Sequence, residues 1–175
     1  MSALESIKIV PKQIGGQSVA IVELDMVGEK VNKFNTALME RLRDVIKELK
    51  TSSYKLVIFK SNKKNIFIAG ADIDEINKMN SREQFEAAVN QGQKLFSEVE
   101  DLPMPTIASV HGACVGGGCE FIMACDYRLA SDDKSTRIGL PEIQLGILPG
   151  FGGCIRMPRM LGLLSALDII LAGKP

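Results

Sequence analysis

The stretch that decides the fold runs from residue 106 to residue 126 and reads TIASVHGACVGGGCEFIMACD. Its apolar, β-branched start at 106–110 predicts a short buried strand, and the apolar segment after the glycines at 116–118 predicts a helix. Glycines at a strand-to-helix junction let backbone N–H groups approach a ligand, and the first turn of a helix attracts negative charge. The stretch therefore indicates either a ligand-binding turn or a structural turn in which Glu120 caps the helix, and it does not decide between them.

A second junction of small residues lies upstream, in IFIAGADIDEI at 66–76. Its apolar run stops at Gly70, between Ala69 and Ala71, and a helix is predicted to begin near Asp72. One interpretation is that Asp72 is simply the N-cap of that helix. The other is that the small side chains leave a second set of backbone donors approachable. The local sequence favours neither.

The rest of the chain predicts alternating strands and helices. Strands are predicted at 19–24, 54–59 and 127–130. A first helix is predicted to begin at Thr36 after an Asn35 cap, and a second, amphipathic helix to occupy 81–100 with Ser81 as its cap. Two short helices are predicted between 154 and 171. Apolar residues recur at helical spacing in the first helix (Leu38, Leu42, Val45, Ile46, Leu49) and in the second (Phe85, Ala88, Val89, Leu95, Phe96, Val99). Gly92 in the second helix allows close packing. A strand, a helix and a strand with short links are typical of a parallel or mixed sheet.

The composition is that of a globular chain of 175 residues, long enough to bury a core. Lys+Arg and Asp+Glu are equal at 21 each, so no overall field favours nucleic acid or a membrane surface as a partner. No apolar run approaches the roughly 18 residues that a membrane span requires. Residues 1–6 lack the basic and apolar regions of a secretory signal. We therefore expect no integral membrane segment.

The cysteines and the single histidine do not form a metal or redox motif. Cys114, Cys119, Cys125 and Cys154 match no Cys-x-x-Cys pattern, and His111 is the only histidine. Buried free thiols in a reducing compartment are the expected state, which indicates a cytoplasmic location and no metal site. His111 follows a strand directly, where a structural role is favoured over nucleophilic catalysis.

Two carboxylates stand out once common motifs have been searched. The chain contains no phosphate-loop, nucleophile-elbow or dinucleotide-binding fingerprint. Glu120 and Glu142 each lie in apolar surroundings rich in glycine or proline. A half-buried carboxyl has a raised pKa, which suits general acid–base catalysis near neutral pH. Two such groups facing one water could add a hydroxyl and a proton to a double bond, while backbone donors near Ala71 and Gly117 stabilise an enolate oxygen.

A structural role for Glu142 remains open on the residues alone. Arg137 and Arg156 are both close enough in sequence to form an ion pair with it. Such a pair would make Glu142 a structural group rather than a reactive one.

Three motifs together resemble the enoyl-CoA hydratase/isomerase (crotonase) family: IAGADI at 68–73, GGGCE at 116–120 and PEIQLGILPGFGG at 141–153. Similarity is greatest to the N-terminal hydratase part of multifunctional fatty-acid oxidation α subunits, whose ending also matches ALDIILAGK at 166–174. The resemblance implies an α/β, crotonase-like (ClpP/crotonase) fold, a spiral of ββα units with mixed sheets. It also implies that 1–175 is a crotonase domain that stops before the last helices of the family, with 3-hydroxyacyl-CoA dehydrogenase domains downstream.

The resemblance assigns roles to the conspicuous residues. The N–H groups of Ala71 and Gly117 would form the oxyanion hole for the thioester carbonyl. Glu120 would activate water, and Glu142 would supply a proton to the α-carbon. The implied reaction is hydration of a trans-2-enoyl-CoA to a 3-hydroxyacyl-CoA in fatty-acid β-oxidation. The alternatives are a Δ3-Δ2-enoyl-CoA isomerase and a non-catalytic homologue that binds acyl-CoA or RNA.

The resemblance further implies a coenzyme A site and partners. The substrate-binding residues would be Ala69, Gly70, Asp72, Ile73, Lys63, Lys64 and Gly116. Hydration needs no cofactor, whereas the dehydrogenase part would use NAD. An acyl-CoA thioester is the expected ligand, and a homo-oligomer or a complex with a thiolase β subunit is the expected assembly. The chain departs from the family at Cys154, where threonine is common, and at Phe151, where a small residue is common. These departures leave the acyl-chain specificity and the local packing open, rather than the roles of the two glutamates.

Overall fold

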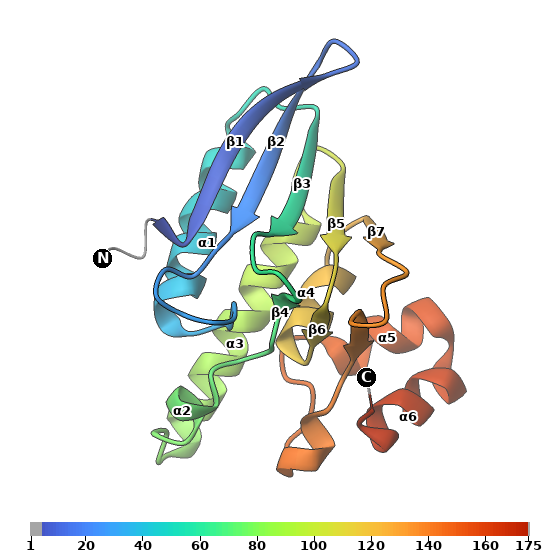
Figure 1. Cartoon of the computed structure of the whole chain (residues 1–175). Coiled ribbons are helices and arrows are strands. Elements are labelled where there is room, and N and C mark those ends of the chain that lie inside the picture. Colours follow the sequence, from blue (N-terminus) through green and yellow to red (C-terminus); the bar gives the residue numbers. More distant parts are fainter. Residues whose placement is uncertain (1–4, 175) are drawn as a thin grey trace.

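The computed structural model describes residues 5–174, which form two β-sheets with helices around them (Figure 1). Residues 1–4, on which part of the signal-sequence argument rests, lie outside the described residues. The larger sheet has the order β1-β2-β3-β5-β7, with strands at Ile7–Ile14, Gln17–Leu24, Leu56–Ser61, Thr106–Val110 and Tyr127–Ala130. The smaller sheet has the order β4-β6-β8, with strands at Ile66–Ile68, Ala113–Val115 and Arg137–Gly139.

The strand directions make the larger sheet mixed. β1 and β2 form an antiparallel hairpin, whereas the other neighbouring strands of the larger sheet run parallel. All pairs of the smaller sheet are parallel. The prediction of an α/β fold is therefore confirmed, with a mixed larger sheet and a parallel smaller one, and β1 is a strand that was not predicted from the sequence.

The unit from β2 to β3 forms as predicted. Helix α1 spans Thr36–Lys50 between them, and the Asn35 side chain accepts a hydrogen bond from the Leu38 N–H at 2.8 Å. Its five predicted apolar positions, Leu38, Leu42, Val45, Ile46 and Leu49, are all buried. Because β2 and β3 are parallel, α1 is the crossover between them.

Helix α3 spans Arg82–Glu100 behind the predicted Ser81 cap, but its apolar stripe does not lie wholly in the core. Leu95, Phe96 and Val99 are buried in its C-terminal half. In its N-terminal half Phe85 is 41% exposed, and like Ala88 and Val89 it lines a cavity. The reason is visible in Figure 1, where the start of α3 extends beyond the sheets toward α2 (Ile73–Ile76).

The stretch at 106–126 contains one element more than predicted. After β5, Gly112 has a φ of +64° and approaches Asn65 so closely that a Cβ would overlap the Asn65 backbone. This turn carries the chain from the larger sheet into β6 of the smaller sheet, from which α4 (Gly117–Met123) begins. A three-residue strand is too short to show a periodicity, so the pattern gave no sign of it.

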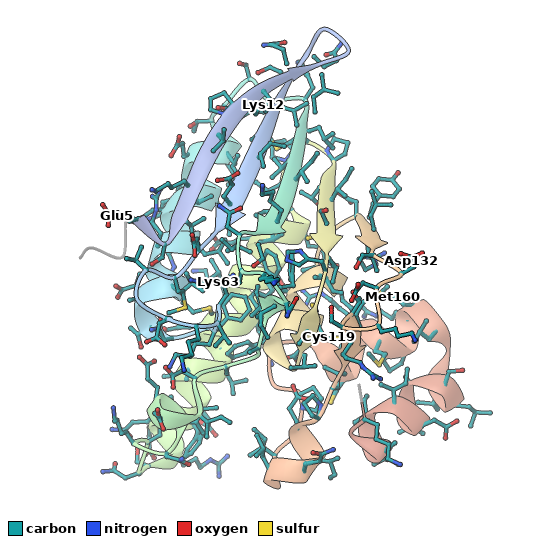
Figure 2. All side chains as sticks on the ribbon, in the orientation of Figure 1. Glu5, Lys12, Lys63, Cys119, Asp132 and Met160 are labelled. Atoms are coloured by element: carbon teal, nitrogen blue, oxygen red, sulfur yellow. The ribbon has the colours of Figure 1, made fainter. Side chains whose placement is uncertain are left out.

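Five phenylalanines form an aromatic core between the sheets and α3. Phe34, Phe59, Phe96, Phe121 and Phe151 contact one another with ring centroids between 5.1 and 5.8 Å apart. Figure 2 shows the side chains that fill the space between the ribbons. Aromatic pairs at these separations stabilise a core beyond their buried area alone.

The C-terminal part contains a 3₁₀ turn, η2 (Glu142–Leu145), followed by α5 (Gly153–Leu161) and α6 (Leu163–Ala172). The two short helices predicted there are confirmed. The prediction of four buried thiols is wrong at one position: Cys114, Cys119 and Cys125 are buried, whereas Cys154, in the first turn of α5, is exposed. Burial raises the pKa of the Cys119 thiol to about 12, so this thiol stays protonated.

Candidate active site

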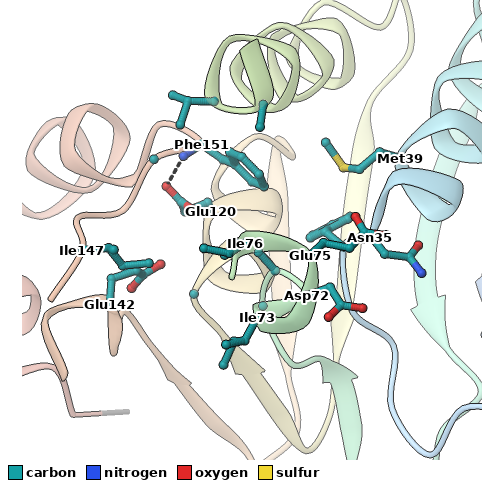
Figure 3. Close-up of a pocket in the computed structure, with 18 of the residues that line it drawn as sticks. Asn35, Met39, Asp72, Ile73, Glu75, Ile76, Glu120, Glu142, Ile147 and Phe151 are labelled. Carbon is teal, nitrogen blue, oxygen red and sulfur yellow. Dashed lines mark hydrogen bonds between the residues drawn. The ribbon is translucent and has the colours of Figure 1, made fainter. Parts of the chain in front are cut away.

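A cavity of about 320 Å³ opens where the two small-residue junctions meet (Figure 3). Its wall is mainly apolar, with side chains from α1, α2, α3 and the segment 145–151. Nine of the eleven predicted site residues line it: Ala69, Gly70, Ala71, Asp72, Ile73, Gly116, Gly117, Glu120 and Glu142. Lys63 and Lys64 are not among the lining residues. A concave apolar site with a few convergent polar groups is the usual form of a small-molecule site.

The Ala71 N–H is one free donor in this cavity. Phe34 and Ala71 form a parallel bridge in which the Phe34 N–H donates to Gly70 at 2.8 Å and the Asp72 N–H donates to Phe34 at 2.9 Å. These two hydrogen bonds use the Gly70 carbonyl and the Asp72 N–H, which flank Ala71. Within residues 5–174 the Ala71 N–H itself has no acceptor.

The Gly117 N–H is the second free donor. Gly117 is the first residue of α4, so its N–H has no acceptor within the helix, and it finds none elsewhere in the described part of the chain. A Cβ added at Gly117 would lie 3.6 Å from the Ala71 nitrogen, which places the two donors side by side. They meet because β4 and β6, which lead into them, are parallel neighbours. Both junctions thus contribute backbone donors to one place.

Glu120 lies in the first turn of α4 and is only 2% exposed. Its Oε1 accepts hydrogen bonds from the N–H groups of Phe151 and Gly153, both at 2.8 Å. It makes no capping bond to its own helix. Burial raises the pKa of the Glu120 carboxyl to about 7, although the two N–H bonds favour its charged form. The interpretation of Glu120 as a helix cap is therefore excluded. A carboxyl with a pKa of about 7 can take up or release a proton near neutral pH.

Glu142 opens the 3₁₀ turn η2 and is 7% exposed. Its Oε2 is buried without a hydrogen-bond partner, and among residues 5–174 no cation lies within ion-pair distance of it. Arg156 pairs with Glu100 instead, at 2.8 Å. Burial raises the pKa of the Glu142 carboxyl. The structural ion pair that the sequence left open is not formed, and burial without a cation shifts this carboxyl toward its neutral form.

Gly116 brings the backbone against this second carboxyl. Its φ of +55° is a conformation that favours glycine, and a Cβ there would lie 3.2 Å from Glu142 Oε1. Figure 3 shows Glu120 beside Phe151, with their hydrogen bond drawn, and Glu142 beside Ile147 within the same cavity. Two carboxyl groups and two free N–H donors thus converge on one apolar space.

The remaining predicted residues have other contacts. The Asp72 carboxylate accepts from the Asp74 N–H at 3.0 Å and pairs with Lys33 at 3.0 Å, so it caps α2 while it lines the cavity. The Lys63 ammonium donates to the carbonyls of Met26, at 2.7 Å, and Glu29, at 2.9 Å. Lys63 is thus engaged in holding the loop after β2. Lys64 is exposed.

His111 has the structural role that the sequence favours. Its Nε2 lies 2.6 Å from the Lys63 carbonyl oxygen, away from both carboxyls of the cavity. The described residues contain no group of three His, Cys, Asp or Glu side chains placed to hold a metal ion. Between residues 5 and 174, no helix is both long enough and apolar enough to cross a bilayer.

The donors that hold Glu120 were not among the predicted site residues. The Phe151 N–H and the Gly153 N–H come from a segment 31 and 33 residues away along the chain. The run of glycines around Phe151 is the one local signal, because glycines leave backbone N–H groups accessible. That signal does not identify the acceptor.

Comparison with known proteins identifies the class that this fold and site define. The sequence profile described as enoyl-CoA hydratase/isomerase matches residues 15–175. A solved enoyl-CoA hydratase from Bacillus anthracis superposes with a TM-score of 0.86 at 33% identity, covering 97% of this chain and 63% of that one. The chain therefore belongs to the enoyl-CoA hydratase/isomerase family and has the crotonase fold.

Within this family the chain is similar to one particular group. It is 44% identical to the fatty acid oxidation complex subunit alpha of Vibrio campbellii and 45% identical to that of Vibrio vulnificus, over 163 residues in each case. These matches cover 93% of this chain but only 23% of each relative. The resemblance to fatty-acid oxidation α subunits seen in the motifs is confirmed, over a segment that corresponds to 23% of each relative's length.

Proposed function

We propose that this chain hydrates trans-2-enoyl-CoA thioesters to 3-hydroxyacyl-CoA in fatty-acid β-oxidation. The observation that carries the proposal is the convergence of two buried carboxyl groups, Glu120 and Glu142, with the free N–H groups of Ala71 and Gly117. Family membership and the names of the relatives support the same reaction.

The two N–H groups would receive the thioester oxygen. Addition of hydroxide to C3 of an enoyl thioester places negative charge on that oxygen as an enolate develops. Donors that are already oriented toward this oxygen stabilise the charge without reorganising. The adjacent Ala71 and Gly117 nitrogens have the free N–H groups that this role requires.

The carboxyl groups would divide the proton transfers. Ionised Glu120, held by the Phe151 and Gly153 N–H groups, takes a proton from water as the hydroxyl adds to C3. Glu142 in its protonated form, which burial without a cation favours, gives its proton to C2. The net change is one water added across the double bond, and the cycle closes when the proton on Glu120 returns to Glu142. A carboxyl whose pKa is close to the working pH suits such exchange.

Other residues of the cavity would hold the rest of the substrate. Ala69, Gly70, Asp72, Ile73 and Gly116 all line it, which supports their assignment to the acyl-CoA site. For Lys63 and Lys64 a contact with the coenzyme A phosphates stays a prediction, since neither lines the cavity.

The relatives support a wider set of proposals about the whole protein. In each relative the matched segment is only 23% of the length, so most of that protein lies outside the match. We propose a crotonase domain at 1–175 followed by a dehydrogenase part that uses NAD, while hydration itself needs no cofactor. Assembly as a homo-oligomer or with a thiolase β subunit, and a cytoplasmic location, belong to the same proposal.

Isomerisation of a Δ3-enoyl-CoA is the second candidate. The unpartnered Oε2 of Glu142 favours it, because in its ionised form this one carboxyl can take a proton from C2 and return it to C4, which moves the double bond. A direct assay separates the two functions. The protein at its full natural length is mixed with trans-2-butenoyl-CoA, and hydration removes the absorbance of the conjugated thioester and yields 3-hydroxybutanoyl-CoA. Absence of that product would refute hydration.

A further inference from the structure

The ring of Phe151 lies between two glycines at the wall of the cavity. On one side is Gly92 of α3, which is buried, and a Cβ added there would overlap the Phe151 ring. On the other side is Gly117, where an added Cβ would lie 3.4 Å from Phe151 Cδ2. The ring also packs edge-on against Phe96, with centroids 5.5 Å apart. Glycine at position 92 is thus a condition for the ring to occupy this place.

The backbone of Phe151 is held independently of its ring. Its N–H donates to Glu120, its carbonyl accepts from Arg156 Nη1 at 3.1 Å, and the preceding carbonyl of Gly150 accepts from Gln93 Nε2 at 2.8 Å. Removal of the side chain therefore leaves the donor to Glu120 in place. The ring and the N–H of this residue can be tested separately.

The Phe151 ring lies where the acyl chain of the substrate would continue beyond the reacting carbons C2 and C3. This step rests on the proposed function, in which the thioester oxygen binds at Ala71 and Gly117 and C3 faces Glu120. The acyl carbons after C3 then continue past Glu120, where the Phe151 ring is the adjoining wall. Phe34 and Val89 line the same space, so it is suited to an alkyl chain.

We propose that Phe151, seated against Gly92, determines the length of acyl chain that the cavity accepts beyond C3. The ring occupies volume that a longer chain would otherwise fill. A side chain at position 92 would push the ring toward Gly117 and narrow the cavity. Phe151 is thus a specificity-determining residue, and Gly92 is the residue that positions it.

The test compares trans-2-dodecenoyl-CoA with trans-2-butenoyl-CoA in the protein at its full natural length. Phe151→Ala is expected to raise the ratio of kcat/KM for the long substrate over the short one about tenfold, since each methylene admitted to an apolar pocket changes discrimination by about this factor or more. Phe151→Leu should shift the ratio less in the same direction. Gly92→Ala should lower it, and Gly92→Ala combined with Phe151→Ala should restore the ratio of Phe151→Ala, because the clashing ring is gone.

The control is Tyr127→Ala, which removes an aromatic ring that is 61% exposed and lies outside this cavity. It should leave the ratio unchanged, and circular dichroism of every variant shows whether it has folded. Hydration of both substrates by the wild type, with a ratio that moves less than about twofold in both Phe151 variants, would overturn this inference and leave the proposed function standing. Failure of the wild type to hydrate either substrate would overturn both. A shift in Tyr127→Ala equal to that in Phe151→Ala would also overturn the inference.

Discussion

Arg156 forms its ion pair with Glu100, at 2.8 Å between Nη2 and Oε2, and not with Glu142. The guanidinium is additionally held by the Phe151 carbonyl and the Ser97 hydroxyl, on the side of α3. A buried carboxyl can be compensated by a cation or by protonation. Since Arg156 is engaged elsewhere, protonation is what the structure favours for Glu142, and this is the state from which it can donate a proton.

The first prediction concerns that proton. Glu142→Gln should lower kcat for hydration about 10²–10⁴-fold, which is the usual contribution of a general acid or base, and leave KM nearly unchanged. The amide has the same shape but cannot supply a proton to C2. The decay of enoyl-thioester absorbance measures the effect, with Glu86→Gln, an exposed residue of α3 outside the cavity, as the control. Hydration at the wild-type rate in Glu142→Gln would contradict the assignment.

The second prediction separates hydration from isomerisation. In Glu120→Gln the amide oxygen can still accept from the Phe151 and Gly153 N–H groups, so the local geometry is retained. The variant should lose hydration, because it cannot take a proton from water, yet still convert a trans-3-enoyl-CoA to the trans-2 isomer through the ionised form of Glu142. Product analysis by chromatography measures both reactions. An equal loss of hydration and isomerisation would contradict the proposed roles, in which Glu120 activates water and Glu142 transfers the proton at carbon.

The third prediction concerns the pH dependence of activity. Glu120 must be ionised to activate water, and burial raises its pKa to about 7. The rate of hydration should therefore rise as the pH increases through about 7. A profile of kcat/KM from pH 5 to pH 9 checks this, and a rate that is constant below pH 6 would contradict it.

The same carboxyl makes a fourth prediction, about stability. The folded-state pKa of Glu120, about 7, is above its ordinary value of 4.5, so between these values the folded protein binds more protons than the unfolded chain. The free energy of unfolding must then fall as the pH rises through this window, by about 3 kcal/mol in total. Glu120→Gln removes this loss and should be more stable than the wild type at pH 8. Urea denaturation at pH 5 and pH 8 measures the difference, and an unchanged pH dependence in the variant would refute the argument.

Sequence signals that are local predicted their elements well. Helix α1 has an Asn35 cap and five apolar positions at helical spacing, and all of these lie within one segment of chain. The three strands of the smaller sheet have only three residues each, and their pairing joins segments far apart in the sequence. No periodicity can show in so short a strand, which is why β6 and β8 were not predicted.

For the site as well, the residues could be predicted from the sequence but their long-range contacts could not. The resemblance brought Ala71, Gly117, Glu120 and Glu142 together, and the structure places all four in one cavity. It could not show what the carboxyls contact, because Glu120 is held by a segment more than thirty residues away. The choice of Arg156 between Glu100 and Glu142 likewise depends on tertiary packing, which no local pattern contains.

The fifth prediction concerns Lys63, whose contacts differ from those expected. Its side chain is 14% exposed, and its ammonium bonds to the Met26 and Glu29 carbonyls and pairs with Asp25 at 2.6 Å. Lys63→Met should lower the free energy of unfolding by about 1–3 kcal/mol, because the carbonyl of buried Met26 loses its donor, whereas exposed Glu29 and half-exposed Asp25 can turn to water. KM for the acyl-CoA should stay close to that of the wild type. Lys64→Met, at an exposed position, is the matched variant for stability. A large rise in KM for Lys63→Met without a loss of stability would instead favour contact with coenzyme A.

Gly116→Ala tests whether the backbone conformation at the glycine run sets the position of Glu142. An alanine there must adopt a φ of +55°, and its methyl group would lie 3.2 Å from Glu142 Oε1, so the carboxyl must move. The variant should lose about 1–3 kcal/mol of stability from the strained backbone and, in addition, a large part of its kcat. Gly146→Ala is the matched control, since its φ is +70° but nothing lies within 4 Å of the added methyl group. It should lose stability and retain kcat, because only Gly116 contacts the carboxyl; an equal fall in kcat in both variants would attribute the effect to the strained backbone instead.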